Sequence, residues 1–156
     1  MTGNNMYGSR ADLLPRFIAD SLRKSNQIIR VLSADENSAA VNISLNRFSH
    51  ASAGVINWDG TPGAEMTSFA DEPAGKEVLK NTLTRIFNQE SSATLFWGTM
   101  VLPSVTLPVN LAEIHSDELV ERDVDFWLFC PESEQLIEFR QDGYVTSAPI
   151  PSAPMD

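Results

Sequence analysis

The last third of the chain contains the feature that most restricts its fold, a series of apolar segments separated by very short turns. DFWLFCP and QLIEFR flank the residues ESE, and QDG then precedes YVTSA. Segments of five or six residues rich in aromatic and β-branched side chains are typical of strands. Because a parallel crossover needs a dozen or more residues, connections this short predict antiparallel pairing. The sequence therefore predicts an antiparallel sheet at its C-terminal end.

Two amphipathic helices are predicted to pack against this sheet. The first has apolar residues at helical spacing from Asp12 to Leu32, with Asp12 as N-cap and Pro15 in its first turn. The second runs from Asp71 to about Gln89 and opens with Asp-Glu-Pro, which favours a helix N-terminus. The fold class predicted is α+β, a mainly antiparallel sheet with two amphipathic helices packed against it.

Shorter elements are predicted between these landmarks. The SADENSA segment is expected to be a loop, and residues 39–48 alternate as a half-buried strand. GVINW is expected to be a second short strand, and residues 64–70 a further strand or an extended loop. Residues 94–103 indicate a strand of mixed exposure, and residues 104–111 continue in extended form. SDELVER is predicted to be a short helix with Ser116 as its N-cap.

Length and composition favour one globular domain. The chain has 156 residues, of which 42% are hydrophobic and 21% charged, as in proteins with a packed core. We expect a flexible lead-in over residues 1–9, a single domain over 10–147 and a proline-rich mobile tail over 148–156. The one cysteine, Cys130, lies in an apolar segment and is expected to be a buried thiol. With no secretory leader and no apolar run long enough for a membrane helix, the expected location is cytoplasmic.

The net charge is −10 and is concentrated late in the chain. Residues 110–142 contain ten acids and only two bases, Arg122 and Arg140. A field of this sign repels nucleic acid and anionic lipid and attracts basic proteins. Neither a nucleic acid nor a membrane is therefore expected as a partner, whereas a protein with a basic surface is.

Motifs for catalysis or metal binding are absent from the sequence. DGTPGAE lacks the lysine and the glycine spacing of a phosphate-binding loop, and one cysteine with two histidines cannot form a structural zinc site. Glu113, His115 and Asp117 offer metal-binding atoms, but residues at i, i+2 and i+4 of a helix do not converge. No catalytic residue, metal or cofactor is therefore assigned.

The stretch HSDELVERDVDFW is the strongest candidate for a binding surface. The helix dipole explains Asp117 and Glu118 in a first turn, but it does not explain the acids that follow. A solvated acidic face and a docking surface for a basic partner both remain open. Trp127 is either an outward aromatic anchor in an acidic rim or a core residue. The candidate partner-binding residues are Glu113, Asp117, Glu118, Glu121, Asp123, Asp125 and Trp127.

Residues 126–148, FWLFCPESEQLIEFRQDGYVTSA, resemble the late β-hairpin of small bacterial immunity proteins, including those that act against contact-dependent and related secreted toxins. The likeness covers an aromatic strand, a Pro-Glu-Ser turn, an acid-containing second strand and a DG turn. It implies a cytosolic, non-catalytic α+β protein that binds one cognate toxin and blocks its active surface. Many such toxins are nucleases with basic clefts, for which an acidic inhibitor is electrostatically suited.

Two other function classes remain open at this stage. A secretion chaperone would also be small and acidic, but it would expose apolar grooves and usually dimerise, whereas a monomer is slightly favoured here. A carboxylate-dependent hydrolase would use Glu113, His115 or Asp117 in a concave site with perturbed pKa values.

Overall fold

The computed structural model describes residues 6–24, 28–52 and 54–155, and it has the predicted α+β fold. The helices are α1 (Arg16–Arg23), α2 (Ala34–Asn42), α3 (Glu72–Ile86), α4 (Val109–Ile114) and α5 (Ser116–Glu121), with 3-10 turns η2 (Ala11–Leu13), η3 (Leu45–Arg47) and η4 (Trp58–Gly60). The strands are β1 (Arg30–Val31), β2 (His50–Ser52), β3 (Val55–Ile56), β4 (Glu65–Ser68), β5 (Ser92–Trp97), β6 (Val105–Pro108), β7 (Phe126–Cys130), β8 (Gln135–Arg140) and β9 (Tyr144–Pro149).

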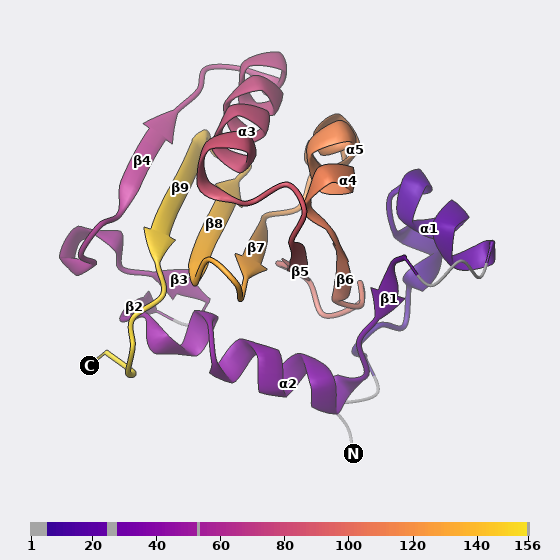
Figure 1. Cartoon of the computed structure of the whole chain (residues 1–156), viewed down its shortest axis with the longest axis horizontal. Helices are drawn as coiled ribbons and strands as arrows, with labels where there is room; N and C mark the ends of the chain where they lie inside the picture. The colour runs from indigo at the N-terminus through magenta and orange to yellow at the C-terminus, as the bar shows by residue number, and fades with distance from the viewer. Residues whose placement is uncertain (1–5, 25–27, 53, 156) are drawn as a thin grey trace.

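A seven-stranded sheet in the order β1-β6-β5-β7-β8-β9-β4 forms the centre of the molecule. Every neighbouring pair in it is antiparallel, and β2 and β3 form a separate two-stranded ribbon. The predicted meander is confirmed as β7, β8 and β9, joined by two short turns (Figure 1). This meander occupies one half of the sheet, between β5 and β4.

Two apolar cores lie on opposite faces of the sheet. Helices α1, α3, α4 and α5 cover one face, where Leu79 and Leu83 of α3 pack with Phe126 and Phe139. The segment from α2 to η4 covers the other face, where Phe48 packs with Trp127 and Leu136. Figure 1 shows α3 and α2 on opposite sides of the strands. Because both faces are covered, each residue of β7 is buried.

The first predicted helix is much shorter than expected. Pro15 precedes its first residue, Arg16, and Asp12 pairs with Arg10 instead of capping α1. The helix has ended by Lys24, and the part expected over residues 25–27 lies outside the described residues. Beyond them the chain forms β1, which pairs with β6. The β-branched residues at 28, 29 and 31 favour this extended structure over a helix.

The strand predicted over residues 39–48 is wrong, and so is the preceding loop, because both lie largely in α2 and η3. The Ser33 side chain accepts a hydrogen bond from the Glu36 backbone, and the Glu36 side chain accepts one from Ser33. This capping box, followed by alanines, starts a helix where alternation suggested a strand. Ile43, expected to be buried in the strand, is 50% exposed.

The remaining predictions fared better. The second predicted helix, the strands at 64–70 and 126–140 and the short helix at 116–121 are all present. His115, however, stands before that short helix, and Ser116 is its first residue. The GVINW strand is reduced to Val55–Ile56, the strand at 94–103 ends at Trp97, and residues 109–114 form α4 where an extended chain was expected.

Both predicted end segments contact the domain. In the lead-in, the Gly8 amide donates to the Met100 carbonyl, and the Tyr7 hydroxyl donates to the Leu32 carbonyl. The predicted tail begins inside β9, which extends to Pro149. Beyond it, the Arg47 guanidinium donates to the carbonyls of residues 151 and 152, and the Met155 amide donates to the Arg47 carbonyl. The domain boundaries expected at residues 10 and 147 therefore fall within bonded structure.

The contrast between the buried and exposed faces of the helices leads to a stability prediction. Leu83 is fully buried in the α3 core, so we expect Leu83→Ala to lower the free energy of unfolding by about 3–5 kcal/mol. Ile114 on α4 is 63% exposed, and Ile114→Ala is expected to change it by at most about 0.5 kcal/mol. Urea unfolding followed by tryptophan fluorescence measures both values. Equal effects of the two substitutions would contradict this assignment of the core.

Candidate partner-binding surface

Acidic side chains from distant parts of the chain gather at one end of the sheet. A depression of about 270 Å³ there is lined by residues from the start of α3, the α5–β7 connection and the β8–β9 turn. The acids of this depression, the neighbouring acids of α5 and Asp125 just before β7 form what we call the acidic end: Asp71, Glu72, Asp117, Glu121, Asp123, Asp125 and Asp142.

Local structure explains why several of these acids stand here. Asp71 is the N-cap of α3, where its carboxylate accepts the Ala74 amide at 2.9 Å, and Glu72 follows in the first turn. Negative charge is favourable at both positions. Asp142 lies in the turn that ends with Gly143, whose φ of 119° suits glycine alone. The Phe69 amide donates to the Gly143 carbonyl and so holds this turn beside the start of α3.

Lysine 76 is the cation nearest to the α3 and α5 acids. Its ammonium group forms ion pairs with Glu121 and, at 3.6 Å, with Glu72. The hydrogen bond that Lys76 donates to Glu121 is the main cause that raises the pKa of Lys76, and the charges of Glu121, Glu72 and Asp117 add to it. Asp117 and Glu121 are one helical turn apart, so they share a face of α5. Lys76 therefore neutralises only part of this group.

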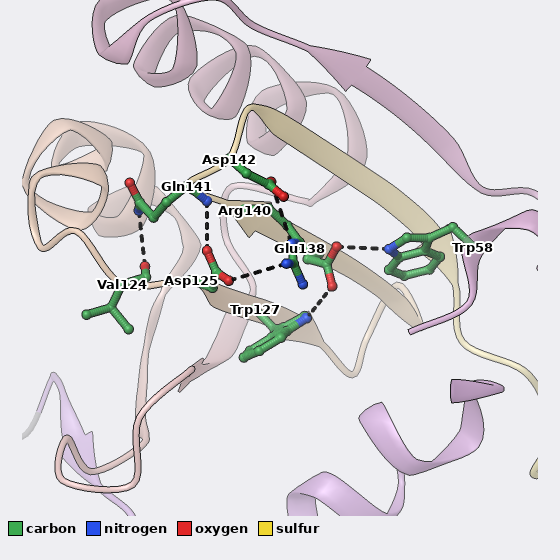
Figure 2. Close-up of polar contacts among 8 residues, drawn as sticks. All are labelled: Trp58, Val124, Asp125, Trp127, Glu138, Arg140, Gln141 and Asp142. Atoms are coloured by element: carbon green, nitrogen blue, oxygen red, sulfur yellow. Dashed lines mark hydrogen bonds and ion pairs between the residues drawn. The ribbon is translucent and has the colours of Figure 1, made fainter. Parts of the chain in front are cut away.

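Arg140 is the cation beside two further acids, Asp125 just before β7 and Asp142 in the β8–β9 turn. Its guanidinium lies 3.9 Å from Asp125 and 3.6 Å from Asp142, beyond hydrogen-bonding distance in both cases. Asp125 also accepts a hydrogen bond from the backbone amide of Gln141 at 2.7 Å, which ties the start of β7 to the β8–β9 turn (Figure 2). With Lys76 and Arg140 as its cations, the acidic end has a formal excess of five negative charges.

The structure brings together four of the seven predicted partner-binding residues. Asp117, Glu121, Asp123 and Asp125 belong to the acidic end. Glu118 instead accepts the Phe17 amide at 3.1 Å and contacts the His115 ring nitrogen at 3.1 Å, so it holds α1 against α5. Glu113 accepts the Thr84 hydroxyl of α3. Both are engaged in joining helices.

Trp127 is not an outward anchor, which corrects that interpretation. Its side chain is 9% exposed and packs in the core beneath α2, because this face of β7 is covered as well. The indole N–H donates to Glu138 at 2.8 Å, and the Trp58 indole donates to the other carboxylate oxygen at 2.9 Å (Figure 2). The two indoles thus hold one carboxylate between the sheet and η4.

The burial of Glu138 could not be predicted from the sequence. It was one of the ten acids expected near the surface, yet it is 2% exposed. Burial raises the pKa of Glu138, and the hydrogen bonds from Trp58 and Trp127 oppose that rise. Strand alternation places Glu138 on the face of Leu136, but no local pattern shows that this face is covered.

The residues considered for hydrolysis or metal binding do not converge. His115 stacks on Phe17 with ring centroids 4.3 Å apart, and the cavity of about 320 Å³ that it lines includes neither Glu113 nor Asp117. Among the described residues there is no group of three or more histidine, cysteine, aspartate or glutamate side chains that could hold a metal ion. Cys130 is buried, as expected.

Comparisons with known proteins give no family for this chain: no protein-family model matches it, and no curated protein matches it significantly in sequence. Within residues 6–24, 28–52 and 54–155, no helix has the length and apolar character needed to cross a bilayer. The geometry described above is therefore the basis for any functional proposal.

Paired tryptophan substitutions test the role of Glu138. Trp127 and Trp97 are 9% and 8% exposed, but the Trp97 indole nitrogen is buried and has no hydrogen-bond partner among the described residues. Because Trp127→Phe removes a bond to a carboxylate, it should cost about 1.5–3 kcal/mol more than Trp97→Phe in urea unfolding at pH 7. Equal costs would show that the indole–carboxylate bond contributes nothing.

The pH dependence of stability provides a second test of the same group. Because the pKa of Glu138 is raised in the folded protein, the folded state binds its proton more tightly than the unfolded chain does. The stability gained from this tighter proton binding is fully present below the ordinary glutamate pKa and is lost as pH rises through the raised pKa of Glu138. We expect the unfolding free energy of the natural protein, minus that of Glu138→Gln, to increase as pH falls through this window. A pH-independent difference would contradict the raised pKa.

Proposed function

We propose that this protein binds a basic protein partner through the acidic end and neutralises a toxin by covering its active surface. The observation that carries the proposal is the convergence, within the described residues, of seven carboxylates from three separate segments (71–72, 117–125 and 142) around two cations. Such a field accelerates association with a basic surface and selects against acidic ones. The likeness of residues 126–148 to immunity proteins supports the toxin as the class of partner, and the cytoplasm as the place of binding.

The placement of the acids also supports binding over a purely solvated surface. Asp117, Asp123 and Asp142 are exposed, and Arg122, which adjoins Asp123 in the sequence, is directed away from them. Its guanidinium donates to the Leu13 carbonyl at 2.7 Å, on the α1 side of the molecule. A partner that supplies lysine or arginine would relieve the repulsion among these carboxylates. Because salt screens such charges, the affinity for the partner should fall as the salt concentration rises.

A charge-matched pair of variants tests this function. The first neutralises the acidic end with Asp117→Asn, Glu121→Gln, Asp123→Asn and Asp142→Asn. The control neutralises four exposed acids elsewhere, with Asp35→Asn, Asp59→Asn, Glu77→Gln and Glu90→Gln. Both change the net charge by the same amount, so a difference between them reports the position of the charges. The partner is first captured with the natural protein from lysate of the native cells at low salt and identified by mass spectrometry.

We expect the acidic-end variant to associate with the captured protein at least about tenfold more slowly than the control at low ionic strength, with a flatter salt dependence. The natural protein should also inhibit the captured protein's own activity. Equal association rates for the two variants would refute the acidic end as the binding surface. Capture of several proteins through unfolded segments would instead identify a chaperone.

A further inference from the structure

A second cavity lies beside the acidic end, on the face of the sheet covered by α2. It has a volume of about 620 Å³, which is within the range of small-ligand sites. Its walls include Phe96 and Trp127 from the sheet, Asn37 and Val41 from α2, and Asp125 with Arg140 at the end nearest the acidic end. Figure 2 shows Trp127 and Asp125 at neighbouring positions on this side of the sheet.

The cavity exists because α2 covers the sheet incompletely. None of the residues of α2 is buried, and those that pack against the core, Ala40 and Val41, are too small to fill the space above the aromatic rings. The capping box at Ser33 and the pair between Arg30 and Glu36 fix the start of the helix. A stable helix over an unfilled, aromatic-walled space is the arrangement of a binding site more than of a packed core.

The charged wall of the cavity consists of Asp125 and Arg140. Behind this wall, the Arg140 guanidinium also lies 3.6 Å from Asp142, and its charge acts on Glu138 (Figure 2). The Arg140 guanidinium makes no hydrogen bond within the described part of the chain, and one Asp125 oxygen has only the ion pair at 3.9 Å. Asp125 therefore keeps acceptor capacity on the side that faces the cavity, and Arg140 shows that a guanidinium fits beside it.

We propose that this cavity receives an arginine side chain of the basic partner, paired with Asp125 and lying against the indole of Trp127. The inference rests on the proposed function, which supplies the basic partner. Arginine fits better than lysine because its planar guanidinium can bond a carboxylate with two N–H groups and stack on an aromatic ring. The low polarity of the aromatic walls strengthens such a pair. Asp125 belongs to both sites, so the cavity continues the acidic end without a break.

Nuclear magnetic resonance of the three indole N–H groups tests the site without the partner. The probe is N-acetyl-arginine methylamide, titrated into the full-length ¹⁵N-labelled protein, and Trp→Phe variants assign the signals. Two matched probes are N-acetyl-citrulline methylamide, of nearly the same shape but neutral, and N-acetyl-glutamate methylamide. The informative variant is Asp125→Asn, whose side-chain oxygen can still accept the Gln141 amide and so preserve the turn. Val41→Phe fills the cavity from α2 and leaves Asp125 intact.

We expect the arginine probe to shift the Trp127 signal in a saturable manner and the citrulline probe to leave it unchanged. Asp125→Asn should weaken the arginine probe by at least about tenfold, and Val41→Phe should abolish its binding. Equal shifts from citrulline, a stronger response to glutamate, or full binding by either variant would overturn the inference. The variant neutralised at positions 117, 121, 123 and 142 should still bind the probe. If that variant associates with the partner as fast as its charge-matched control does, while the probe still binds the cavity, the proposed function alone is refuted.

Discussion

The burial of both faces of the central strands determines most of what this protein can do. The α3 core and the α2 core enclose β7 and β8 so fully that Trp127 and Glu138 have little contact with water. A carboxylate in that position needs donors for both oxygens, and Trp58 and Trp127 provide them. The same bonds attach η4, far away in the sequence, to the middle of the sheet. The connection before β4 is therefore fixed to the core by one acid.

Coverage of both faces also determines where charge can accumulate. Helices occupy the two sides of the sheet, so ionised groups that are not paired inside must stand at the ends of the strands or on the outer helix surfaces. At the acidic end, a helix N-cap, a tight turn and the first turn of α5 each supply an acid for a local reason. None of those reasons requires the others, yet the fold places these acids side by side. The negative electrostatic field of this surface therefore arises from acids that each have a structural role of their own.

The elements that could be predicted from the sequence are those in which local and tertiary preferences agree. The meander from β7 to β9 and helix α3 have strong periodicity and clear turn or cap residues, and both were predicted almost to their ends. The strand predicted over residues 39–48 was wrong because apolar and polar residues alternate there as they do in a half-buried strand. The capping box at Ser33, also present in the sequence, starts a helix instead. The acids of α5 and its following turn are already close together in the sequence. The proximity of Asp71, Glu72 and Asp142 to them depends on strand order, which no local pattern encodes.

Glu138 and Asp125 show how similar acids come to have different roles on adjacent strands. Glu138 has both oxygens occupied by indole N–H groups, so it can accept little from a partner without losing structure. One oxygen of Asp125 accepts the Gln141 backbone amide in the turn. The other forms only a loose ion pair with Arg140, at 3.9 Å, beside an open cavity. An added cation therefore competes with packing at the first position but with a loose ion pair at the second. Because loose pairs at partly exposed positions contribute little to stability, Asp125 can exchange or share its cation while the fold is held by Glu138.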